Sequence, residues 1–180
     1  MRDNFAVEFW IAQGFKNTPE LLLFSEFPIA FMVLLIISVM VLIKNNKHAF
    51  FINHAIMFSC GLLMLISTLL FSMKWMGPIS WMIIAGFSMY MPYIAYHTVY
   101  FERWIAYFRY KGNAGFLMYM ADSAGYLGSM LVLLYRNFGA HDLSWTEFFT
   151  FGSWVIGGIM VLLSLIAYIY FIKVPSKSLV

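Results

Sequence analysis

Five long, predominantly apolar stretches constrain the fold of this chain more than any other feature. Crossing about 30 Å of bilayer hydrocarbon takes about 20 helical residues, because each adds about 1.5 Å. Runs that approach or exceed this length cover residues 27–43, 51–73, 79–101, 114–135 and 148–172. The sequence therefore predicts an all-α integral membrane bundle with five transmembrane helices in a single domain. Ser144 and Glu147 form an S-x-x-E capping box, which predicts the start of the fifth helix.

Composition supports this class. Only 11% of the 180 residues are charged and 63% are hydrophobic, whereas about 25% are charged in soluble proteins. A globule of this size cannot bury so much apolar surface, so we expect the lipid bilayer as a partner. The net charge of +3 comes from basic residues scattered between the apolar runs. Since they form no block, nucleic acid is not an expected partner.

The distribution of Lys and Arg over the short loops predicts the orientation, because these residues favour the cytoplasmic side. One side of the predicted topology holds four of them and the other holds seven. The seven are Lys44, Lys47, Arg103, Arg109, Lys111, Lys173 and Lys177. This count predicts a cytoplasmic tail at residues 173–180 and an extracytoplasmic segment at residues 1–26. Such an N-terminal segment suggests that a preceding helix is missing.

Asp122 lies eight residues into the fourth apolar run, about 12 Å below its start by helical rise. A carboxylate at such a depth costs about 2.5 to 3.5 kcal/mol on insertion scales, so it should face protein or water and have a partner. Two interpretations are open. Asp122 is a proton or cation site, or it belongs to a structural ion pair.

Tyr93 and His97 belong to a stripe of aromatic residues on one face of the third predicted helix. The stripe predicts either a wall lining a path for a solute, with His97 able to titrate near neutral pH, or an interfacial belt with core packing. Pro92 lies within the same helix and predicts a kink, because proline removes a backbone donor.

Glu102 and Arg103 follow at the predicted cytoplasmic end, and His54 lies near the same end of the second helix. They are candidates for a cytoplasmic gate, or they are charges that snorkel at a helix end. Small residues spaced by four also predict close helix packing. These are Ala121, Gly125 and Ser129 in the fourth helix, with Ser153 and Gly157 in the fifth.

Motifs for catalysis or metal binding are missing from the sequence. It contains no H-E-x-x-H, no G-x-S-x-G and no phosphate-binding loop. The single Cys60 excludes an intrachain disulfide and a thiolate zinc cluster. We therefore expect no enzyme activity, no cofactor and no metal site.

Several segments resemble the C-terminal part of an uncharacterised bacterial membrane-protein family that is similar to the major facilitator superfamily. The most specific is GNAGFLMYMADSAGYLGSMLVLLYRNFG at 112–139, with RDNFAVEFW at 2–10, SEFPIA at 25–30, ERWIAYFR at 102–109 and LSWTEFF at 143–149. The resemblance implies helices eight to twelve of a facilitator-type transporter, preceded by the end of helix seven. It also implies the inner membrane of a bacterium.

Two functions are compatible with this pattern. One is part of a secondary transporter of an unknown small solute, coupled to protons through Asp122, with Tyr93 and His97 lining the path. Because a facilitator moves its substrate between two halves, the partner would be the missing N-terminal half or a second copy of the chain. The other is a non-catalytic membrane scaffold or assembly subunit that acts through helix–helix contacts.

Overall fold

The structure, a computed structural model, describes residues 2–15, 19–139 and 143–173, and over these residues it is helical without a strand. The α-helices are α1 (Arg2–Ala12), α2 (Pro19–Val41), α3 (Asn46–Ser72), α4 (Pro78–Ala95), α5 (Phe101–Phe108), α6 (Ala114–Leu134) and α7 (Trp145–Lys173). Two π-helical segments, η1 (Tyr96–Tyr100) and η2 (Tyr135–Gly139), continue α4 and α6.

Five helical segments are long and apolar enough to cross a membrane, which confirms the predicted fold class. They are Glu20–Val41, Asn46–Ser72, Pro78–Phe108, Ala114–Gly139 and Trp145–Lys173. The first is longer than the predicted run at 27–43, because α2 already begins at Pro19. Proline at the first helical position costs no hydrogen bond, and Glu20 in the first turn is favourable there.

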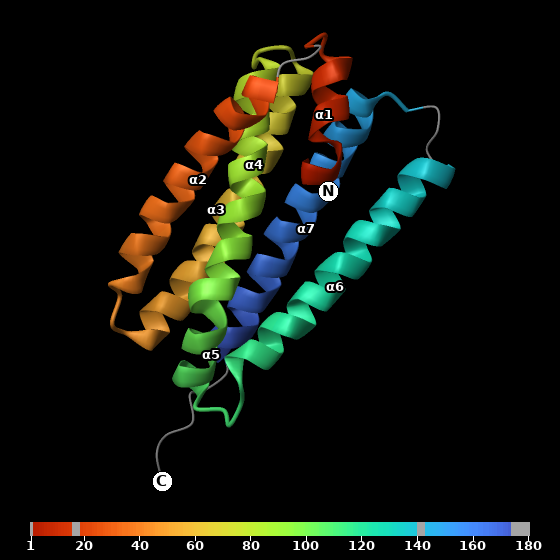
Figure 1. The fold of residues 1–180 in the computed structure, drawn as a ribbon. Helices are drawn as coiled ribbons and strands as arrows, with labels where there is room; N and C mark the ends of the chain where they lie inside the picture. Colours follow the sequence, from red (N-terminus) through yellow and green to blue (C-terminus); the bar gives the residue numbers. More distant parts are fainter. Residues whose placement is uncertain (1, 16–18, 140–142, 174–180) are drawn as a thin grey trace.

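Residues 1–26, predicted as one extracytoplasmic segment, contain the helix α1 and the start of α2. α1 runs beside one end of α7 (Figure 1). Phe9 and Trp10 are buried there, and the Phe9 ring lies 5.4 Å from the rings of Trp81 and Phe149. This aromatic packing explains why the segment folds onto the bundle.

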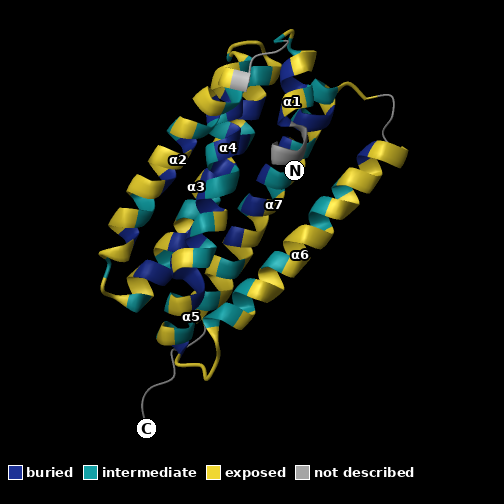
Figure 2. Ribbon diagram, viewed as in Figure 1, coloured by how far each residue is buried: buried dark blue, intermediate teal, exposed yellow. Residues whose placement is uncertain are grey.

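The centre of the bundle is formed by α3, which packs against both α7 and α4, while α2 covers the other side of α4 (Figure 1). The buried residues gather on these central helices, α3, α4 and α7 (Figure 2). The apolar residues on the outer faces are exposed, as expected for a surface that meets lipid. Leu34 of α2 and Leu162 of α7 are examples.

α3 and α7 approach most closely where two glycines face each other. A Cβ atom added to Gly61 would lie 3.1 Å from the backbone nitrogen of Val161, and one added to Gly157 would lie 2.9 Å from Leu65 Cδ2. Ser153, one turn before Gly157, is buried. Gly157 therefore lies in the contact between α3 and α7, with the buried Ser153 one turn before it, and Gly61 is the facing residue that the spacing rule had not identified.

α6 differs from the other membrane helices, because none of its residues is buried (Figure 2). Leu117 and Met118 pack at its first half against the aromatic cluster of α3 and α5. At its far end the Arg136 guanidinium lies 4.3 Å above the Trp145 ring. Between these two points α6 is separated from α7 (Figure 1).

No helix of the described chain packs on the face formed by Ala121, Gly125 and Ser129, so their predicted packing against another helix stays a prediction. Ala121 and Gly125 are exposed, and a Cβ added to Gly125 would have no neighbour within 4 Å. The physical reason is that α6 is attached near its two ends, which leaves the face with the small residues open. The opposite face, with Phe116 and Leu127 exposed, agrees with the expected lipid contact.

The contact between α3 and α7 leads to a test of the fold. Replacing Gly61 by Val should lower the free energy of unfolding in detergent by about 1 to 3 kcal/mol, because the added methyl groups would push against the α7 backbone. Gly158→Val is the matched control, since a Cβ at Gly158 meets nothing within 4 Å. Equal unfolding free energies for the two variants would contradict the close contact.

Candidate functional site

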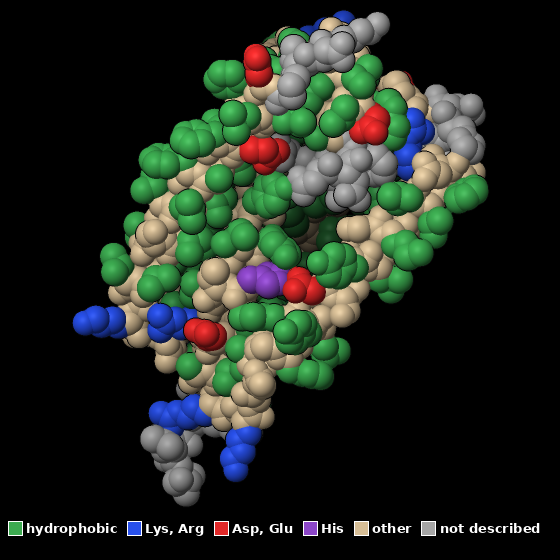
Figure 3. Space-filling view, in the orientation of Figure 1, with side chains coloured by type: hydrophobic (Ala, Val, Ile, Leu, Met, Phe, Trp, Pro, Cys, Tyr) green, Lys and Arg blue, Asp and Glu red, His purple; other side chains and the backbone are tan. Residues whose placement is uncertain are grey.

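His97 and Asp122 form a hydrogen-bonded pair between η1 and α6. The distance from His97 Nε2 to Asp122 Oδ1 is 2.8 Å. Sequence analysis predicted that Asp122 would have a partner, and the structure identifies His97. The two side chains are 22% and 31% exposed, so the pair can be reached from outside the bundle. Figure 3 shows a histidine against an acidic side chain, next to a hollow in the surface.

The position of His97 depends on the π-helical segment that follows α4. Pro92 lies inside α4, and the backbone stays α-helical as far as Ala95. The departure from α-helical geometry begins at Tyr96, one turn after the residue at which the kink was predicted. A π segment inserts an extra residue into a helical turn and often occurs at functional sites. Here it contains His97.

Hydrogen bonding at both ring nitrogens restricts the protonation of the pair. His97 Nδ1 lies 2.9 Å from the backbone oxygen of Tyr93, which can only accept, so Nδ1 must carry a proton. Nε2 then either donates to an ionised Asp122 or accepts a proton from a neutral one. In both cases the same proton lies between the two side chains.

Tyr93 completes the immediate surroundings of the pair. Its ring lies 4.3 Å from the His97 ring, and its side chain is half exposed. The Tyr93 hydroxyl is within electrostatic range of the Asp122 carboxylate and of the Tyr126 hydroxyl. The structure thus brings together the three residues that the sequence assigned to transport or coupling, and it adds Tyr126 from α6.

The predicted gate of Glu102, Arg103 and His54 is wrong for His54, which does not lie beside the two charged side chains. Arg103 Nη1 donates to Asn46 Oδ1 at 2.7 Å, which ties α5 to the first turn of α3, and Glu102 is exposed. His54 is only 2% exposed and donates from Nδ1 to the backbone oxygen of Phe50 at 3.1 Å. It lies among aromatic rings rather than beside the charges.

The aromatic cluster explains the burial of His54. Its ring centroid lies 4.7 Å from Phe50, 5.4 Å from Tyr100 and 5.8 Å from Phe171. Three helical segments therefore converge on the imidazole, and ring packing there excludes the charged side chains. No sequence spacing indicates this cluster, because Phe171 comes from the far end of α7 and Tyr100 from η1.

Asn46 was also missed by sequence reasoning. Its place in the first turn of α3 is a usable signal, since a polar side chain there can reach a neighbouring helix. Among the residues that the structure describes, no group of three or more His, Cys, Asp or Glu side chains could hold a metal ion. Cys60 is buried and unbridged.

Comparison with known proteins gives a family but no activity. Residues 1–174 match the model of a family of unknown function, DUF5690. No curated protein and no solved structure matches the chain. Nothing in these comparisons links it to the major facilitator superfamily, so that resemblance stays a prediction. Because the match spans nearly the whole sequence, the chain belongs to the family of unknown function DUF5690.

Proposed function

We propose that this protein is part of a secondary transporter of a small solute, with proton coupling through the His97–Asp122 pair. The observation that carries the proposal is the 2.8 Å bond between an imidazole and a carboxylate on two different membrane helices. Ionisable groups within membrane helices are expensive and mark ion or proton pathways in many transporters. The resemblance to facilitators supports the same function.

The proton held by the pair can control the position of α6. With the proton present, the bond joins the middle of α6 to η1. Without it, a neutral imidazole that donates from Nδ1 presents the lone pair of Nε2 to the carboxylate, and the two acceptors repel. Since α6 has no buried residue, moving its middle breaks few apolar contacts. Gain or loss of this proton would therefore change the position of α6.

The exposed polar groups of α6 favour a path that a second element completes. Tyr119 and Tyr126 are each 76% exposed, and both flank Asp122 on the helix. In lipid their hydroxyl groups would lack hydrogen-bond partners. In our proposal they face the solute path, whose other wall is the N-terminal half of a facilitator-type transporter or a second copy of this chain.

The proposal includes an orientation in a bacterial inner membrane. The loop between α2 and α3, the loop between α5 and α6 and the end of α7 lie at one end of the bundle (Figure 1). That end carries Lys44, Arg109 and Lys111. The excess of basic residues supports placing it in the cytoplasm. In this orientation the exposed sides of His97 and Asp122 face the space beside α6.

The coupling proposal predicts a solute-dependent current driven by a pH gradient. Native membrane vesicles containing the protein, adsorbed on a solid-supported electrode, are supplied with mixtures of amino acids, sugars and organic acids. Asp122→Asn should reduce the pH-driven current to the background of vesicles without the protein, because the pair then has no carboxylate to share its proton.

Glu20→Gln is the matched control, since Glu20 is an exposed carboxylate in the first turn of α2. Its current should equal that of the wild type. A pH-driven current of wild-type size in Asp122→Asn vesicles would contradict the coupling function of the pair.

The open face of α6 favours a second candidate, a membrane scaffold or assembly subunit. Gly125 and the adjacent small residues Ala121 and Ser129 allow another helix to approach closely, and no helix of the described chain occupies this face. In that case the pair would fix the angle of α6 for a partner, and no solute would move.

Disulfide cross-linking in native membranes tests this candidate. Gly125→Cys in a Cys60→Ser background should give one defined cross-linked species after mild oxidation and gentle detergent extraction. Phe116→Cys, on the opposite and exposed face of α6, should give none. A scaffold requires this species together with the absence of an Asp122-dependent current. Monomer and aggregate alone would count against it.

A further inference from the structure

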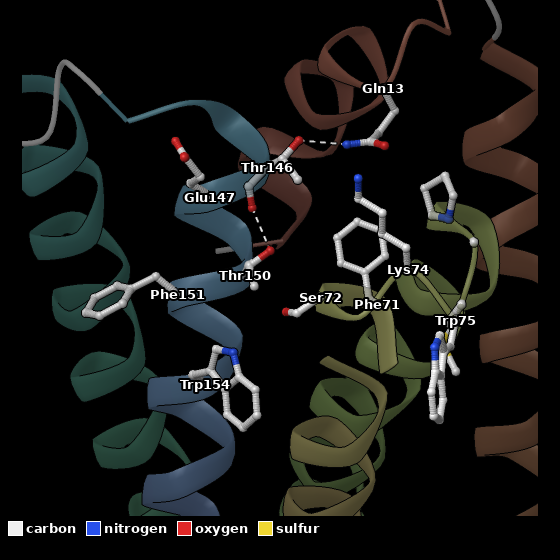
Figure 4. A pocket seen from close by; sticks show the side chains of 13 residues that line it. Gln13, Phe71, Ser72, Lys74, Trp75, Thr146, Glu147, Thr150, Phe151 and Trp154 are labelled. Carbon is white, nitrogen blue, oxygen red and sulfur yellow. Dashed lines mark hydrogen bonds between the residues drawn. The ribbon is translucent and has the colours of Figure 1, made fainter. Parts of the chain in front are cut away.

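A second feature lies at the end of the bundle that contains the loop between α3 and α4. The segments around α1, α3, α4 and α7 enclose an open pocket of about 700 Å³ there (Figure 4). Its lining includes Gln13, Ser72, Lys74, Trp75, Thr150 and Trp154. Neither of the two proposed functions uses it.

The close contact of α3 and α7 explains the pocket. The helices approach at Gly61 and Gly157 and leave space between them near Ser72 and Thr150. Gln13, just after α1, reaches across one side and donates from Nε2 to Thr146 Oγ1 at 2.7 Å (Figure 4). The pocket is therefore bounded by three separate parts of the chain.

Lys74 gives the pocket its positive charge. No ion pair of Lys74 is present within residues 2–15, 19–139 and 143–173. The one carboxylate in the lining, Glu147, already accepts hydrogen bonds from the Ser144 nitrogen at 2.9 Å and hydroxyl at 2.8 Å. It points to the other side of α7 (Figure 4). These bonds confirm the predicted capping box and leave the ammonium uncompensated.

The backbone holds Lys74 at the pocket through the turn that ends α3. The Trp75 nitrogen donates to the Leu70 oxygen at 2.9 Å, and the Lys74 nitrogen donates to the Phe71 oxygen at 3.0 Å. This is a Schellman motif, whose left-handed position usually holds glycine. Lys74 occupies it with a φ of 60°.

Aromatic side chains form the outer walls of the pocket. Trp75 is 76% exposed and Phe151 is 58% exposed, and the Trp154 ring lies opposite Trp75 across the opening (Figure 4). Trp residues gather at the level of lipid headgroups, and the ends of membrane helices lie at this level. An occupant must therefore combine an anionic group with apolar parts.

We propose that this pocket binds an anionic phospholipid, with the headgroup phosphate paired to Lys74 and the glycerol and first acyl carbons against Trp75 and Trp154. The apolar walls favour a lipid over free phosphate. The Glu147 carboxylate points to the other side of α7 (Figure 4), so no carboxylate of the lining faces the position of a headgroup ammonium, which favours a headgroup with net negative charge over a zwitterionic one. This site is independent of the proposed transport function.

Calorimetric titration of the full chain in detergent with dihexanoyl phosphatidylglycerol tests the site. The wild type should bind the lipid, and Lys74→Gln should bind it about fivefold more weakly, as expected for the loss of one interfacial cation. Lys44→Gln is the matched control, because Lys44 is also exposed but lies at the other end of the bundle. Its affinity should equal that of the wild type.

Lys74→Gly separates binding from folding. Glycine adopts a positive φ without strain, so this variant should melt at the wild-type temperature or above it, yet lose the same affinity as Lys74→Gln. Three results would each overturn the proposal: wild-type affinity in both Lys74 variants, equal affinity of the wild type for dihexanoyl phosphatidylcholine, or equal affinity for inorganic phosphate.

Discussion

The hydrogen bond between His97 and Asp122 is the interaction on which the proposed working of this protein depends. It joins the middle of α6 to the rest of the bundle, with 2.8 Å between Nε2 and Oδ1. The rest of α6 has no buried residue, and its attachments lie near its two ends. The Asp122 carboxylate, which would be costly in lipid, thus links the loosely packed helix α6 to the well-packed core of the bundle.

The helices of the bundle differ in how tightly they are packed. α3, α4 and α7 meet through buried aromatic and glycine contacts, and the cluster around Phe50 and His54 packs near the last turns of α7. Such interiors change little without a large loss of packing energy. α6 has no buried residue. This difference is the reason for placing the motion of the proposed transport function in α6.

Sequence patterns predicted the five membrane helices because lipid leaves the backbone no alternative to a helix over long apolar runs. They also predicted that Asp122 needs a partner, because a charged residue inside a long apolar run is visible in the sequence and its cost in lipid does not depend on the rest of the fold. The identity of the partner depends on how α4 and α6 lie in space, and on the π segment that contains His97. Likewise, His54 was assigned to the charges at its end of the helix. Its aromatic neighbours come from α3, η1 and α7, and no spacing along the chain indicates such convergence.

The most direct test of the central claim is the distance from α6 to the bundle as a function of pH. Spin labels at Leu127 of α6 and Leu34 of α2, both exposed, would report it by pulsed electron resonance in a Cys60→Ser background. The account predicts one narrow distribution at acid pH and a longer, broader one at alkaline pH, with Asp122→Ala broad at every pH because alanine has no group to bond His97. A wild-type distribution that stays the same at all pH values would contradict it.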